Sequence, residues 1–228
     1  MAKPILLKSP TSNMKISELA LTTTPTSWRK VFEDAKDEYS HIENILSRSE
    51  FFPLPKNIFR CFDLTPLPNV QVVLLGKEPY ATRKPNGFPK DQGLCYSVSR
   101  GDEVPIVLKN ILKEAGQPTL HGDLSSWGAQ GVLLLNVCLT VPMGKPGGNG
   151  ILWDGLIYRV FEAIAEVNPS CIYVIPQNLS DYKKYIPQTS IFLDTPPVHI
   201  PKFLGCGVFQ QINDELIKQR RDAIDWSL

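Results

Sequence analysis

Four short runs of valine, isoleucine and leucine stand out along the chain, at residues 70–76, 131–136, 171–176 and 190–194. Their hydrophobicity is continuous and does not alternate with polar positions. That pattern is typical of strands buried on both faces, as in a parallel sheet with helices on either side. We therefore predict four parallel β-strands.

Between and around these runs, apolar residues recur at helical spacing with charged residues in the gaps. Ser27 is the predicted N-cap of the first of these helices. Alternation of strands and helices indicates an α/β fold, and no linker interrupts it. We expect a mobile N-terminal arm over residues 1–20 and one domain over residues 21–228, with a four-stranded parallel sheet flanked by helices. The predicted helices lie within residues 26–50, 57–62, 104–118, 153–169 and 209–221.

Composition narrows the functional classes. The 228 residues carry a net charge of +1, so any nucleic-acid binding must rest on a local patch. The five cysteines are odd in number and lack C-x-x-C spacing, which argues against a zinc site or a disulfide framework. No apolar run is long enough to span a membrane. We predict a protein of an intracellular, reducing compartment without metal or cofactor; nucleus, cytoplasm and viral factory are not distinguished.

In a parallel α/β sheet, ligand sites lie beyond the carboxyl ends of the strands. Polar or aromatic residues follow each of the four runs here, and we expect them to face one pocket. They are Glu78 and Tyr80 after the first run, Asn136 at the end of the second, Gln177 and Asn178 after the third, and residues 195–201 after the fourth.

Several stretches resemble family 1 uracil-DNA glycosylases. They read VQVVLLGKEPY, QGLCYSV, HGDLSSWGAQGVLLLNVCLTV and the ending IDWSL, preceded by FPLPKNIFRCFDLTPLPNV. The resemblance runs from about Ser27 to the C-terminus and implies the glycosylase fold and DNA as a partner. In that family, a carboxylate orients water at the sugar while hydrogen-bond donors stabilise the leaving uracil.

The resemblance implies a base pocket formed by Tyr80, Tyr96 and Asn136. Tyr80 keeps the aromatic ring that blocks the thymine methyl group, Tyr96 takes the place of a stacking phenylalanine, and Asn136 reads the uracil edge. Glu78 is the candidate catalytic residue, although the family motif G-Q-D-P-Y-H has aspartate there. The extra methylene displaces the carboxylate, and a displacement of about 1 Å can cost on the order of 10²-fold in rate.

The candidate DNA loops depart further from the family. Its H-P-S-P-L-S motif aligns with DTPPVHIPKFLGC, so that Thr195 falls at the catalytic histidine and His199 at the wedge leucine. A shift of register could return His199 to the donor role, but we expect an exposed loop histidine. The other changed positions in these loops are Val107, Gln177, Asn178, Pro196 and Pro197.

These observations leave three hypotheses. The changed catalytic loops favour a uracil-DNA glycosylase fold with a degenerate site, serving as a weakly active or non-catalytic component that binds DNA or a protein partner. The retained base pocket supports an active glycosylase that uses Glu78 to orient water. A module that binds uracil or a nucleotide is the third. The insertion at residues 81–91 adds Arg83, Lys84 and Lys90, either as phosphate or partner contacts or as a solvated loop.

Overall fold

The computed structural model describes residues 15–228, and its centre is a four-stranded parallel sheet. The strands are β2 (Val72–Gly76), β3 (Val132–Asn136), β5 (Ile172–Pro176) and β6 (Ile191–Thr195), in the order β3-β2-β5-β6. The four predicted strands and their parallel arrangement are confirmed.

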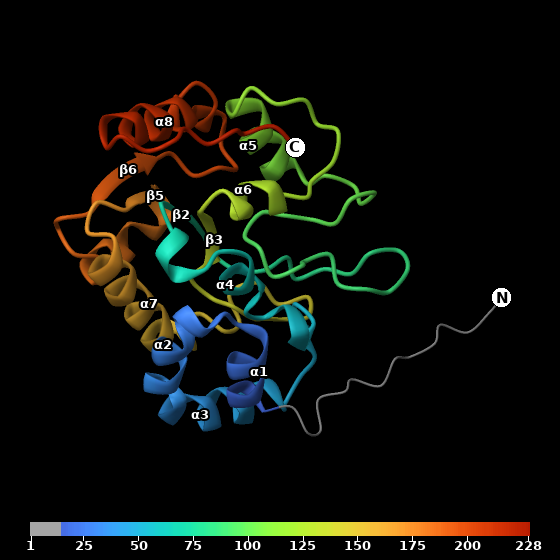
Figure 1. Ribbon diagram of the computed structural model, residues 1–228. Helices are drawn as coiled ribbons and strands as arrows, with labels where there is room; N and C mark the ends of the chain where they lie inside the picture. Colours follow the sequence, from blue (N-terminus) through green and yellow to red (C-terminus); the bar gives the residue numbers. More distant parts are fainter. Residues whose placement is uncertain (1–14) are drawn as a thin grey trace.

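Burial explains why these segments read as continuous apolar runs. Every residue of β2, β3 and β5 is buried, since helices cover both faces of the sheet. Figure 1 shows α5 (Ile106–Glu114) and α8 (Val208–Lys218) on one side, and α7 (Asp154–Val167) and α2 (Arg29–Asp34) on the other. The edge strand β6 is only partly buried.

The helix expected within residues 26–50 is divided in the structure. A 3₁₀ turn, η2 (Thr26–Trp28), precedes α2, and α3 (Lys36–Leu46) follows after Ala35. The prediction that Ser27 is a helix N-cap is wrong, because the N-cap positions of η2 and α2 are Pro25 and Trp28. The Ser27 hydroxyl instead accepts a hydrogen bond from the backbone N–H of Leu67 at 3.2 Å, so it joins this segment to the turn before β2.

The predicted N-terminal arm ends earlier than expected. Helix α1 spans Ile16–Thr23, and the side chains of Ile16 and Ala20 are fully buried. The N–H of Ile16 also donates to the Glu43 carboxylate at 2.6 Å. Residues 16–20 therefore belong to the domain, because their apolar face packs on α2 and α3. The remainder of the predicted arm, residues 1–14, lies outside the described residues.

Short elements complete the fold. Two of them, β1 (Phe51–Phe52) and β4 (Val141–Pro142), form an antiparallel pair that the apolar pattern does not predict, because each has only two residues. The others are η3 (Pro55–Asn57), α4 (Arg60–Leu64), η4 (Leu67–Asn69), α6 (Ser125–Ala129), η5 (Gln177–Tyr185) and η6 (Pro201–Phe203).

All five cysteines are free thiols, and four of them are buried among apolar side chains. Among residues 15–228, no helix is both long enough and apolar enough to cross a membrane.

The C-terminus is fixed by an aromatic cluster. The ring of Trp226 packs edge-on against Trp127 of α6, at 5.0 Å between centroids, and against Phe209 of α8, at 4.8 Å. The indole N–H of Trp127 donates to the carbonyl of Trp226 at 3.0 Å. This contact gives the ending IDWSL a structural role, since it closes one side of the core.

We expect Trp226→Ala to destabilise the protein by about 3–5 kcal/mol, because it removes a buried aromatic side chain and leaves a cavity. Chemical denaturation measures this change. Ile217→Ala on α8 is the matched control, since Ile217 is 60% exposed, and a surface substitution should alter the stability by less than about 0.5 kcal/mol. Equal effects for the two variants would contradict the role of the cluster.

Candidate active site

A pocket of about 300 Å³ opens beyond the carboxyl ends of the strands. It is lined by six of the site residues predicted individually from the sequence, by Val198 from the predicted segment 195–201, and by Lys77, which was not predicted. The six are Glu78, Tyr80, Tyr96, Val107, Asn178 and His199. Five separate segments of the chain thus meet at the edge where parallel strands place their ligands.

Gly76 and Asn136 are the last residues of β2 and β3. Neither is among the residues that line this pocket, although Asn136 is predicted to belong to it. They are register partners in the sheet, and Asn136 is buried. A Cβ atom at Gly76 would stand 2.5 Å from Asn136 Oδ1 and 2.7 Å from the Cys95 side chain. Only glycine therefore allows the amide of Asn136 to sit against the end of β2.

Hydrogen bonds to backbone carbonyls fix the two predicted pocket tyrosines. The hydroxyl of Tyr80 donates to the carbonyl of Tyr96 at 2.8 Å, and the hydroxyl of Tyr96 donates to the carbonyl of Leu75 at 2.8 Å. Tyr96 adopts a left-handed φ of 64°, which a bulky residue rarely does. Burial raises the pKa of both hydroxyls, so they stay protonated and act as donors.

Glu78 contacts a loop that the sequence did not connect with it. Both of its carboxylate oxygens accept the backbone N–H of Gly147, at 3.0 and 2.8 Å. The loop is anchored near this point, because the Asn149 side chain donates to the hydroxyl of Thr140 at 3.0 Å. The longer glutamate side chain is thereby fixed by a backbone donor, which a sequence motif does not reveal.

The loop after β6 brings His199, not Thr195, to the pocket. Val198 beside it is buried, and the Asn110 side chain of α5 donates to the Val198 carbonyl at 3.0 Å. Thr195 is 3% exposed, and its hydroxyl lacks a hydrogen-bond partner among the described residues. His199 is exposed to solvent as expected, and it lines the pocket, which we expected of residues 195–201 after the fourth strand.

Three other predicted positions do not line this pocket. Gln177 is exposed at the start of η5, whereas Pro196 and Pro197 are half-buried in the loop that carries His199. Their sequence positions placed them at strand ends, but the turn that follows each strand directs only some side chains inward.

Two cations of the 81–91 insertion are paired within the protein. Arg83 forms an ion pair with Glu50 and lies over the ring of Phe52. Lys84 lies 2.6 Å from Asp102, and both side chains are largely buried. These pairs favour a structural role for the two cations over a phosphate contact.

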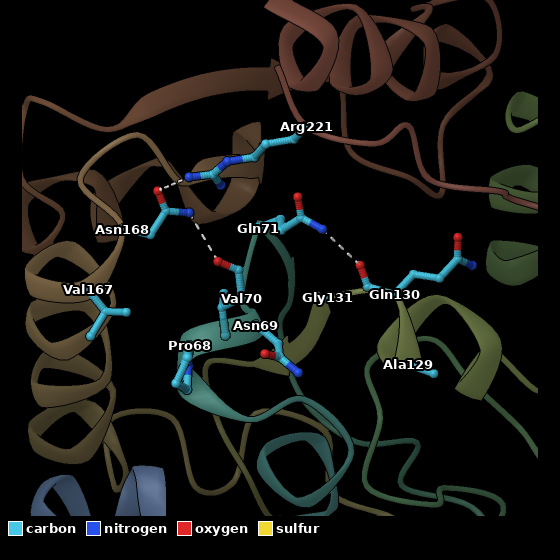
Figure 2. Close-up of a pocket in the computed structure, with 10 residues that line it drawn as sticks. All are labelled: Pro68, Asn69, Val70, Gln71, Ala129, Gln130, Gly131, Val167, Asn168 and Arg221. Atoms are coloured by element: carbon cyan, nitrogen blue, oxygen red, sulfur yellow. Dashed lines mark hydrogen bonds between the residues drawn. The ribbon is translucent and has the colours of Figure 1, made fainter. Parts of the chain in front are cut away.

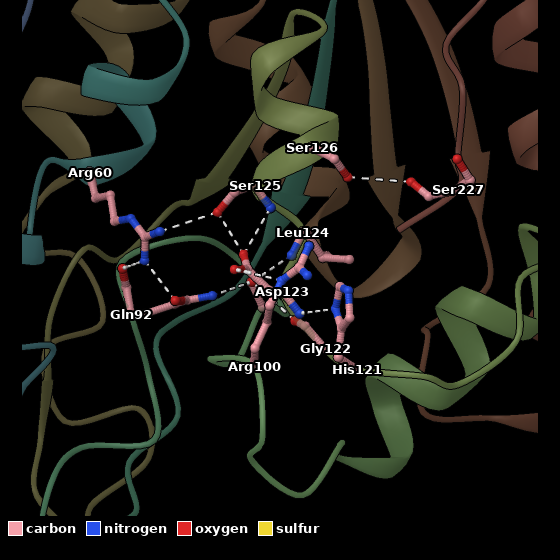
Figure 3. A network of polar contacts seen from close by, with 11 residues as sticks. Arg60, Gln92, Arg100, His121, Gly122, Asp123, Leu124, Ser125, Ser126 and Ser227 are labelled. Carbon is pink, nitrogen blue, oxygen red and sulfur yellow. Dashed lines mark hydrogen bonds and ion pairs between the residues drawn. The ribbon is translucent and has the colours of Figure 1, made fainter.

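A polar network holds the segment that leads into Tyr96, as Figure 3 shows. Arg60 donates to the side chain of Gln92 at 2.7 Å and to Ser125 at 3.2 Å. Gln92 in turn donates to Ser97 at 2.7 Å. Helix α4, residues 92–97 (the stacking segment, named for the predicted stacking residue Tyr96) and α6 are therefore joined by this network.

A second cavity, of about 530 Å³, lies at the opposite end of the sheet. Figure 2 shows its polar side chains bonded to one another and to the chain. Arg221 donates to Asn168, Asn168 to the carbonyl of Val70, and Gln71 to the carbonyl of Gln130. These bonds close the amino-terminal edge of the sheet, so we assign this cavity a structural role.

Residues 15–228 contain no group of three or more histidine, cysteine, aspartate or glutamate side chains arranged to hold a metal ion. The polar groups around the pocket are a carboxylate, two phenols, an imidazole, two amides and an ammonium group. This set can bind a planar base by hydrogen bonding and stacking, and it can orient a water molecule.

Solved structures share this architecture. The crystal structure of mimivirus uracil-DNA glycosylase superposes with a TM-score of 0.85 at 20% identity, over 92% of this chain and 89% of that chain. The UNG structure from Nitratifractor salsuginis gives 0.64 at 14% identity, over 86% and 94%. A variant of the mimivirus protein was crystallised in complex with UGI. The protein therefore has the uracil-DNA glycosylase fold.

Sequence relatives extend the likeness beyond the fold. The chain is 33% identical over 227 residues to the uracil-DNA glycosylase of Vibrio vulnificus, covering 90% of this chain and 98% of that protein. It is 32% identical over 191 residues to the enzyme of Streptococcus pyogenes, covering 77% and 83%. No family model matches the chain. The chain belongs to the uracil-DNA glycosylase family.

These comparisons change the balance between the hypotheses from the sequence. Relatives at this identity carry the name of the active enzyme, and they do not support the expectation of a degenerate, non-catalytic component. The alternative, an active glycosylase, agrees better with them. The resemblance and the fold predicted from the sequence are confirmed.

We expect Asn110→Ala to release the loop that carries His199, because it removes the donor to the Val198 carbonyl. Loss of one such hydrogen bond costs about 1 kcal/mol. Hydrogen exchange read by mass spectrometry should become faster in residues 196–201. Lys109→Ala, at an exposed position of the same helix, is the control. Unchanged exchange in the loop would show that Asn110 does not hold it.

Proposed function

We propose that this protein is an active uracil-DNA glycosylase, which hydrolyses the bond between uracil and deoxyribose. The observation that carries the proposal is the meeting of Glu78 and His199 in one pocket with the two tyrosines. The identity of 32–33% to uracil-DNA glycosylases supports it.

The chemistry explains what each group contributes. Breaking the glycosidic bond creates positive charge on the sugar and negative charge on the departing base. In our proposal, the Glu78 carboxylate stabilises the sugar cation and orients water, as a carboxylate does in glycoside hydrolysis. The base leaves the helix stack and is read in the pocket, where Asn136 meets its edge and Tyr96 stacks on it.

His199 is the donor that we assign to the departing base. An imidazole at the pocket wall can donate to the uracil oxygen on which charge develops, and such preorganised donors stabilise the transition state. Thr195 occupies the aligned family position, but its hydroxyl is buried. The contact between Asn110 and Val198 supports this change of register, because it fixes the loop beside the pocket.

The partner in this proposal is DNA, single- or double-stranded, and contact with it must be local because the net charge is only +1. Lys77 is exposed at the pocket rim and can meet a phosphate. The departures from the family loops favour a non-catalytic alternative, in which the protein binds uracil-containing DNA or a protein partner without turnover. A module that binds free uracil is a second alternative.

We expect Glu78→Gln to lower uracil release from single-stranded DNA by about 10²–10⁴-fold, because the amide cannot act as a base. Abasic-site cleavage on a gel measures the product. Glu78→Asp is the matched control, which keeps the charge but withdraws it from Gly147. Absence of release by the wild-type protein would refute the proposal. DNA binding that weakens as salt rises would then favour the non-catalytic alternative.

We expect His199→Ala to lower kcat by about 10²–10³-fold, which is typical when one preorganised donor is lost. Thr195→Val is the comparison, because it removes a hydroxyl without a partner at nearly constant volume and should leave kcat unchanged. The test is single-turnover kinetics of both variants. The reverse order of effects would return the donor role to the aligned family position.

A further inference from the structure

The carboxylate of Asp91 joins the two loops that form the pocket. Its Oδ2 accepts the backbone N–H of Tyr80 at 3.0 Å, and its Oδ1 accepts the N–H of Gly93 at 2.7 Å. Tyr80 lies two residues after Glu78, while Gly93 lies in the stacking segment. One buried side chain, 4% exposed, thus sets the position of the carboxylate loop relative to the stacking segment.

The stacking segment cannot shift to accommodate the other loop. Gly93 has a φ of 82°, and a Cβ atom there would stand 1.9 Å from the carbonyl oxygen of Asn57. Arg60 of α4 also donates to the backbone carbonyl of Gln92 at 3.2 Å, as Figure 3 shows. Because this segment is fixed to α4, the hydrogen bond from Asp91 determines where the Tyr80 backbone lies.

The ionised form of Asp91 accepts the two N–H groups best. When the carboxyl group is protonated, one of its oxygens becomes a hydroxyl, which is a weaker acceptor, so one of the two hydrogen bonds is weakened. Burial raises the pKa of Asp91 to about 7, against the opposing effects of the two N–H groups and Arg60. The other titratable groups that act on it are Cys61, Cys95 and Tyr80, all of which remain neutral because burial raises their pKa.

We propose that Asp91 is a positioning residue: its ionised carboxylate holds the Glu78 loop in the reactive geometry, and its protonation frees that loop. This inference rests on the proposed glycosylase function. Asp91 is not among the residues that line the pocket, so it acts through the backbone of Tyr80. Uracil release should accordingly be limited by the protonation state of a group outside the base pocket.

The first measurement does not depend on activity. In ¹⁵N-labelled protein, the amide signals of Tyr80 and Gly93 should shift with a common midpoint near pH 7, and Asp91→Asn should abolish this titration. Asp123→Asn is the matched control. Asp123 also accepts an N–H, from Ser125 at 3.0 Å. Partial burial raises the pKa of Asp123, but the hydrogen bonds from Ser125 and the nearby Arg60 and Arg100 together lower it below its usual value. A titration that survives in Asp91→Asn would overturn the proposal.

Stability gives a second readout with a defined sign. Between about pH 4 and pH 7, folded Asp91 keeps a proton that the unfolded chain has released. The free energy of unfolding should therefore fall as pH rises through this window, and the fall should be smaller in Asp91→Asn. Parallel pH dependence of the two proteins would contradict the assignment.

Kinetics then test the positioning role. At alkaline pH, we expect Asp91→Asn to lower kcat by about 10–10²-fold, as misplacement of a catalytic group does, with the affinity for uracil-containing DNA unchanged. The decline of wild-type activity below pH 7 should be absent in Asp91→Asn and present in Asp123→Asn. Equal kcat values for wild type and Asp91→Asn would overturn the positioning role.

Absence of uracil release by the wild-type protein at any pH would instead refute the proposed glycosylase function. The amide titration would then still decide whether Asp91 couples the two loops.

Discussion

The structure depends on the burial of a parallel sheet on both faces. Every position of β2, β3 and β5 is buried. Before their carboxyl ends these strands carry a single polar side-chain group, the buried hydroxyl of Tyr173. Asn136 is the first polar group on β3, and it lies at the last residue of the strand. The polar groups of the site are therefore concentrated at one edge of the sheet. The buried strands fix the residues from which the loops at this edge begin.

This constraint explains why the sequence predicts so much of the fold. Continuous apolar runs define the strands, and the strand ends identify Glu78, Tyr80 and Asn136 as neighbours. The two-residue strands β1 and β4 are not predicted, because so short an element has no periodicity. The break between helices at Ala35 is not predicted either, since α2 and α3 together keep an apolar face at helical spacing.

The candidate site is less predictable where the contacts are made by backbone groups. Neither the N–H of Gly147 at Glu78 nor the N–H of Tyr80 at Asp91 leaves a signal in the residue types. His199 is the clearest case, because an alignment assigns it by counting from Gly205 while the chain positions it through Asn110 and a buried Val198. A residue four positions beyond Thr195 therefore lines the pocket.

Gly76 sets a limit on how such a site can change. The loops at the rim can exchange a histidine, lengthen a carboxylate or gain an insertion, because each is anchored separately to the scaffold. The end of β2 has no such freedom, since any side chain at Gly76 would collide with Asn136 and Cys95. Substitutions that alter the site should therefore accumulate in the surrounding loops, while the close approach of β2 and β3 at their carboxyl ends stays a fixed dimension of the fold.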